Sequence, residues 1–80
     1  MVYQPKGVCS KAIDVEVEGD VIKSVKFTGG CNGNLQGISS LVAGMEIKDA
    51  IGKLRGIKCG VKNTSCPDQL ACALQEILDN

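Results

Sequence analysis

Alternating polar and apolar residues near the N-terminus predict a pair of β-strands. Between residues 13 and 18, one Ile and two Val alternate with acidic residues, which is the pattern of a strand with one buried face. Gly19 and Asp20 supply a tight turn, and a second strand is predicted over residues 21–27. The two strands predict an antiparallel hairpin. The residues expected on the buried face of the second strand are Val21, Val25 and Phe27.

The rest of the chain shows the spacing of amphipathic helices. One helix is predicted between an N-terminal cap at Asn32 or Asn34 and Gly44, which ends it. A second is predicted over about residues 47–55, with Gly56 at its C-terminal end. A third is predicted from about residue 66 to the C-terminus. These elements predict an α+β fold, in which a small antiparallel sheet precedes about three helices. The apolar residues expected to face the core from the first of these helices are Leu35, Ile38, Leu41 and Val42.

The composition fits a single small domain over residues 1–80. One Tyr, one Phe and no Trp leave a core thin in aromatic rings, and scaffolds of this size often add a disulfide, a metal or a partner. Nine basic and nine acidic residues give zero net charge, which argues against a nucleic-acid-binding protein. Residues 1–7 predict an irregular entry without an apolar leader, and no stretch is long enough to span a membrane. We therefore expect a cytoplasmic protein.

Residues 64–68, with the sequence Thr-Ser-Cys-Pro-Asp, predict the start of the last helix. Ser65 is expected to accept a backbone N–H, and Asp68 stands three residues later, as in a capping box. Pro67 suits the first turn of a helix. Cys66 therefore lies in that turn, where the positive end of the helix dipole attracts negative charge. A cysteine in this place is suited to metal binding or to redox chemistry.

Four of the five cysteines share a local setting, since each lies in a loop or at the end of an element, close to a glycine or a proline. These four are Cys9, Cys31, Cys59 and Cys66. Cys72 lies inside the last helix and points away from its apolar stripe. An odd number of cysteines in a cytoplasmic chain fits reduced thiols better than a disulfide framework.

Four thiolates without any histidine favour Zn²⁺ or an iron–sulfur cluster. Buried or redox-active thiols are the alternatives. The chain has no Cys-x-x-Cys pair, which disfavours a thioredoxin-like dithiol. It also has no histidine, which excludes catalysis by a Cys–His or Ser–His pair.

The Thr-Ser-Cys-Pro-Asp sequence is the signature of the TSCPD domain, and the chain resembles short, stand-alone members of that family over nearly its whole length. The other matching segments are KGVCS at residues 6–10, FTGGCNGN at 27–34 and GIKCG at 56–60. The resemblance implies a link to ribonucleotide reductases, because the domain also occurs at the C-terminus of some of them, notably cobalamin-dependent ones. An 80-residue chain is too small for the barrel and nucleotide site of such an enzyme. The resemblance therefore implies an accessory module, whose partner is a ribonucleotide reductase or another redox protein.

The order of three cysteines also resembles U-type iron–sulfur scaffold proteins. In those proteins one cysteine precedes the first strands, a second lies in a Gly-Cys loop after a strand, and a third begins a late helix. Cys9, Cys31 and Cys66 follow this order, and Cys59 is the candidate for a fourth ligand. This resemblance implies the scaffold's α+β fold, with the cysteine loops converging at one end. Ser65 stands where those proteins often have a histidine.

Three functional hypotheses follow from the sequence. The first is a metal-binding module that holds Zn²⁺ or an iron–sulfur cluster through the four loop cysteines. The second is an accessory domain of a nucleotide reductase that exchanges thiols and disulfides. The third is a structural or partner-binding domain whose cysteines are merely buried.

Overall fold

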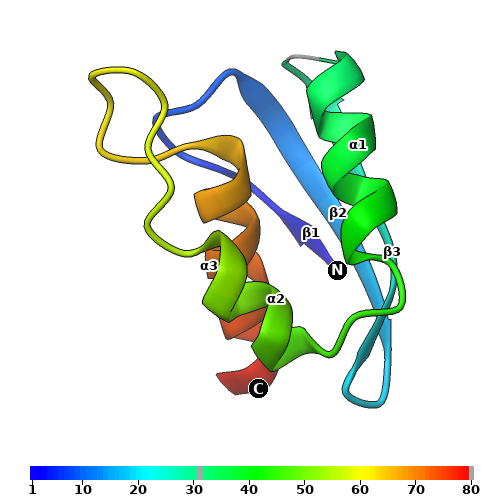
Figure 1. Cartoon of the computed structure of the whole chain (residues 1–80). Helices are drawn as coiled ribbons and strands as arrows, with labels where there is room; N and C mark the ends of the chain where they lie inside the picture. The colour runs from blue at the N-terminus through cyan, green and yellow to red at the C-terminus, as the bar shows by residue number, and fades with distance from the viewer. Residues whose placement is uncertain (31, 80) are drawn as a thin grey trace.

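The computed structural model describes residues 1–30 and 32–79 and has the predicted α+β architecture. A three-stranded antiparallel sheet, in the order β1-β2-β3, is followed by three helices (Figure 1). Among the described residues, no helix is long and apolar enough to cross a membrane. The elements are β1 (Val2–Tyr3), β2 (Ser10–Glu18), β3 (Val21–Gly29), α1 (Asn32–Val42), α2 (Ile47–Leu54) and α3 (Cys66–Asp79).

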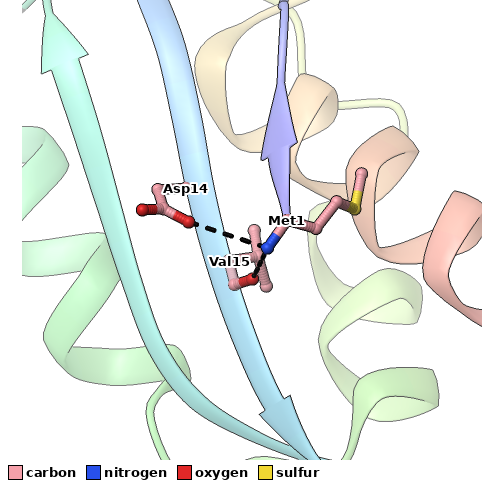
Figure 2. Close-up of polar contacts among 3 residues, drawn as sticks. All are labelled: Met1, Asp14 and Val15. Atoms are coloured by element: carbon pink, nitrogen blue, oxygen red, sulfur yellow. Dashed lines mark hydrogen bonds and ion pairs between the residues drawn. The ribbon is translucent and has the colours of Figure 1, made fainter.

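The first residues form a strand where the sequence predicts an irregular entry. β1 pairs with β2 through Val2 opposite Asp14 and Tyr3 opposite Ile13. The ammonium group of Met1 donates a 2.9 Å hydrogen bond to the carbonyl of Val15 and lies 3.8 Å from the Asp14 carboxylate (Figure 2). The Val15 N–H donates in turn to the Met1 carbonyl at 2.8 Å. This short strand is stabilised by long-range pairing, so its local sequence does not predict it.

A β-bulge at Lys23 changes which side of β3 faces the core. Glu16 pairs with Ser24, but the next pair joins Val17 to Ile22, so Lys23 is an extra residue on β3. Ile22 is consequently buried completely, whereas Val21 is 39% exposed. The prediction that Val21 faces the core is therefore wrong, because strict alternation fails across a bulge. Val25 is buried and Phe27 half-buried, as predicted.

The core lies between one face of the sheet and the helices. Strands β2 and β3 and all three helices contribute to it, and α2 and α3 lie side by side (Figure 1). The sequence predicts Leu41 in this core, but Leu41 is 78% exposed, because it lies at the outer margin of the apolar stripe of α1. The other sheet face carries the exposed acidic residues of β2. The buried cluster comprises Ile13, Val15, Ile22, Val25, Val42, Ile47, Ala50, Ile51, Leu70, Ala73 and Leu74.

Candidate functional site

The predicted cap at the start of α3 is present. The backbone N–H of Asp68 donates a 3.1 Å hydrogen bond to the Ser65 side chain, and α3 begins at Cys66. The Ser65 hydroxyl donates to the carbonyl of Ile57 at 2.7 Å. Ser65 is buried, and its hydroxyl group joins the α2–α3 loop to the first turn of α3.

Asp68 ties the end of α2 to the start of α3. Its carboxylate accepts hydrogen bonds from the Thr64 hydroxyl at 2.5 Å and from the Gly56 N–H at 2.8 Å. The Thr64 bond, followed by the Gly56 bond and the nearby Arg55 charge, lowers the pKa of Asp68 below its usual value. In a capping box this carboxylate would accept from the Ser65 N–H. The structure instead gives it partners in the preceding loop.

Gln69 is a second polar connection that the sequence analysis missed. Its side-chain carbonyl oxygen accepts the Lys6 N–H at 3.0 Å and lies 3.5 Å from the Tyr3 hydroxyl, which donates to it. Its amide nitrogen donates to the Thr64 hydroxyl at 3.0 Å. Gln69 is buried beside Leu70, so a polar residue adjoining the apolar stripe was the available signal. It fastens the N-terminal segment to the first turn of α3.

Three of the predicted cysteines line one hollow of about 390 Å³. They come from the β1–β2 connection, the α2–α3 loop and the first turn of α3, which lie at the same end of the molecule (Figure 1). Cys66 is buried at 8% exposure, whereas Cys9 and Cys59 are exposed. No carboxylate lies among the lining residues. The other lining residues are Asn34, Leu35, Ile38, Ile57, Lys58, Ser65 and Pro67.

Close contacts position Cys66 and Cys9. The sulfur of Cys66 lies 3.2 Å from the hydroxyl oxygen of Ser10, and both side chains are buried. Gly30, at φ +81°, lies against Cys9, since a Cβ atom there would come within 3.2 Å of its sulfur and 3.0 Å of Leu35. A glycine is therefore required both by the backbone conformation and by the space beside Cys9.

The structure describes only one of the other two cysteines. Cys31 lies outside the described residues. Cys72 is half-buried in α3 and is not among the residues that line the hollow. It lies near the hydroxyl of Tyr3, whose pKa is raised first by burial and then by Cys72. Within residues 1–30 and 32–79, no three Cys, Asp or Glu side chains are arranged to hold a metal ion.

These features define a class of protein: a small α+β domain in which three cysteines line one hollow beside the capped start of its last helix. The family model described as the TSCPD domain matches residues 1–78. The chain therefore belongs to the TSCPD domain family. Comparisons with curated proteins and with solved structures gave no match.

Proposed function

We propose that this domain binds Zn²⁺ or an iron–sulfur cluster through cysteine thiolates. The observation that supports this most strongly is that Cys9 lines the same hollow as Cys59 and Cys66, although it is about 50 residues away from them in the sequence. Its donors are sulfur atoms without a carboxylate or an imidazole, which is the set that soft metal centres prefer. Cys31 completes the proposed set as the fourth thiolate.

The described structure fits a site that closes when metal binds. Uncompensated thiolates repel one another, and metal binding is coupled to local folding. Cys66 is buried at a helix start, whereas Cys9 and Cys59 are exposed in the connections that precede β2 and α3. A zinc ion held in this way supplies structural stability, and an iron–sulfur cluster supplies electron transfer. The thiol side chains of the chain provide the ligands in either case.

We further propose a cytoplasmic accessory role beside a ribonucleotide reductase or another redox protein, because the TSCPD domain also occurs at the C-terminus of some ribonucleotide reductases. The TSCPD domain, which spans residues 1–78, is itself too small for the catalytic barrel of a reductase, so we propose that its site serves chemistry carried out elsewhere. A thiol–disulfide role is the second candidate, because Cys59 and Cys66 carry free thiols and line the same hollow. Metal-free protein that forms a reversible disulfide between these residues would favour it.

Elemental analysis and the visible absorption spectrum test this proposal on protein purified without chelator and without oxygen. We expect stoichiometric zinc in colourless protein or iron and sulfide in brown protein. Replacing Cys9, Cys31, Cys59 or Cys66 singly with Ser should reduce the metal content strongly. Cys72→Ser is the matched control and should leave it unchanged. Metal-free wild-type protein, or equal losses in all five variants, would contradict the proposal.

A further inference from the structure

The charges of this neutral chain are separated between its two ends. Residues 4–11, 33–38 and 56–67, which we call the loop end, carry four lysines and no acidic residue. Residues 18–20 and 43–49, at the opposite end in Figure 1, carry four acidic residues and one lysine. The loop end is therefore basic, although the net charge of the chain is zero. The lysines of the loop end are Lys6, Lys11, Lys58 and Lys62.

The two ends are far enough apart to act independently. The molecule is 34 Å long along its principal axis. The Debye length is about 8 Å at physiological ionic strength, so charges at one end are screened from the other. The Asp68 carboxylate, which accepts from Gly56 and Thr64 beside the loop end, offsets one of the four lysine charges. A partner that approaches the loop end therefore still meets a net positive field.

The loop end also exposes aliphatic side chains. Val61 is fully exposed between Gly60 and Lys62, and Ile57 is 42% exposed beside Lys58. Ile57 also lines the hollow, whose wall is completed by aliphatic residues of α1. Neither the core nor the cap at Ser65 requires an exposed aliphatic side chain at the tip of this loop.

We propose that the loop end is a docking surface for an acidic segment of a partner protein that also carries apolar side chains. Apolar side chains of the segment pack against Val61 and Ile57 outside the hollow, and its carboxylates lie against Lys58 and Lys62. Charge complementarity of this kind speeds association and selects the partner. The inference goes beyond the proposed metal site, because it rests on the lysines and aliphatic residues and not on bound metal.

The same observations favour a protein over a nucleic acid or a membrane. Tyr3 and Phe27, the two aromatic residues, lie outside the loop-end segments, so these segments offer no ring for base stacking. Four lysines also give a small electrostatic contribution to phosphate binding. The two exposed aliphatic side chains, Ile57 and Val61, are too few to form an apolar face that inserts into a membrane.

Selection from a random peptide library against the immobilised, as-isolated full chain tests the inference. We expect the selected peptides to be rich in Asp or Glu and in aliphatic or aromatic residues, and their binding to weaken with salt. The double variant Val61→Ser/Lys62→Glu should bind a selected peptide about tenfold more weakly, because it reverses a charge and removes an apolar contact. The matched control Leu41→Ser/Lys48→Glu makes the same kinds of change outside the loop end and should bind normally.

Selected peptides without acidic enrichment, or equal affinity for the two double variants, would overturn the inference. A single-stranded RNA oligomer and phosphatidylglycerol vesicles are measured in parallel. Tighter binding of either probe, lost in the Val61→Ser/Lys62→Glu variant, would also overturn it in favour of that ligand. The metal content of both variants should equal that of the wild type. A failure of docking is thereby distinguished from a failure of the metal site.

Discussion

At the scale of single residues, Asp68 has a role that its place in the helix start does not reveal. Its carboxylate holds the Thr64 hydroxyl and the Gly56 N–H, and both bonds favour the ionised form. The lowered pKa means that the folded protein holds this proton less tightly than the unfolded chain does. The stabilisation is complete well above the usual pKa of 3.8 and is lost as the pH falls through the lowered folded value.

Asp68→Asn should therefore lower stability at neutral pH and flatten its acid dependence. We expect a loss of about 1 kcal/mol at pH 7, because the amide retains only part of the hydrogen bonding. The difference from wild type should shrink as the pH falls below 3.8. Urea unfolding over a pH series measures this difference in the free energy of unfolding. Asp49→Asn, in the first turn of α2, is the control. A difference that stays constant into acid would contradict the assigned role.

Cys66 and Cys72 provide the second comparison at this scale. Cys66 is buried beside Ser10 and lines the hollow, whereas Cys72 lies in mid-helix outside it. If metal is bound, Cys66→Ser should lower the melting temperature strongly, because metal-binding energy contributes to folding. If Cys66 is only a buried thiol that binds no metal, Cys66→Ser should lower the free energy of unfolding by about 1–3 kcal/mol, with or without zinc.

Thermal melting of Cys66→Ser and Cys72→Ser, each with added zinc and with chelator, makes this measurement. We expect zinc to raise the melting temperature of Cys72→Ser and of the wild type, and to leave Cys66→Ser nearly unchanged. Identical melting curves for the two variants, unmoved by zinc, would remove the special role of Cys66.

At the scale of elements, the connection between β3 and α1 depends on Gly30. Its backbone has φ +81°, and a Cβ atom would approach Leu35, Cys9 and the Ser10 nitrogen within 3.0–3.3 Å. Gly44, which follows α1, has φ +88° but open space around it. Comparing alanine substitutions at Gly30 and Gly44 therefore separates the cost of left-handed backbone strain from the cost of steric crowding.

Gly30→Ala should destabilise the domain more than Gly44→Ala. Both variants incur about 1–2 kcal/mol of left-handed strain, and Gly30→Ala adds about 1–3 kcal/mol of overpacking. Chemical denaturation of both variants gives the comparison. Zinc binding by Gly30→Ala should also weaken, since the new methyl group presses on Cys9. Equal stability of the two variants would show that the contacts around Gly30 relax without cost.

Features set by neighbouring residues were predictable from the sequence. The β2–β3 hairpin, the glycines that end α1 and α2, and the Ser65 cap all depend on local patterns, and the structure confirms them. The bulge at Lys23 and the pairing of β1 depend on distant strands, so alternation alone misses them. The partners of Asp68 and Gln69 lie in preceding loops, which no pattern within α3 reveals.

In the candidate site too, features set by the local sequence were predictable and contacts between distant residues were not. Loop placement beside glycine or proline singled out the cysteines, and the structure brings Cys9, Cys59 and Cys66 to one hollow and leaves Cys72 outside it. The contact of Cys66 with Ser10 joins residues 56 positions apart and was not predictable. The metal-binding role of the four cysteines stays a prediction.

At the scale of the whole molecule, the cysteine loops gather at one end of a small domain. The core is built from aliphatic residues, and loop residues together with residues of α1 and the first turn of α3 form the hollow. A metal bridging those loops would tie together the β1–β2 connection, the α2–α3 loop and α3. Small domains often gain their stability from such a link.

X-ray absorption spectroscopy at the edge of the bound metal tests this central claim most directly. In zinc-loaded protein we expect a first shell of sulfur atoms at about 2.3 Å. Cys59→Ser should replace one sulfur in that shell, whereas Cys72→Ser should leave the spectrum unchanged. A shell of nitrogen and oxygen atoms, a shell altered by Cys72→Ser, or protein that takes up no metal would contradict a thiolate site at the loop end.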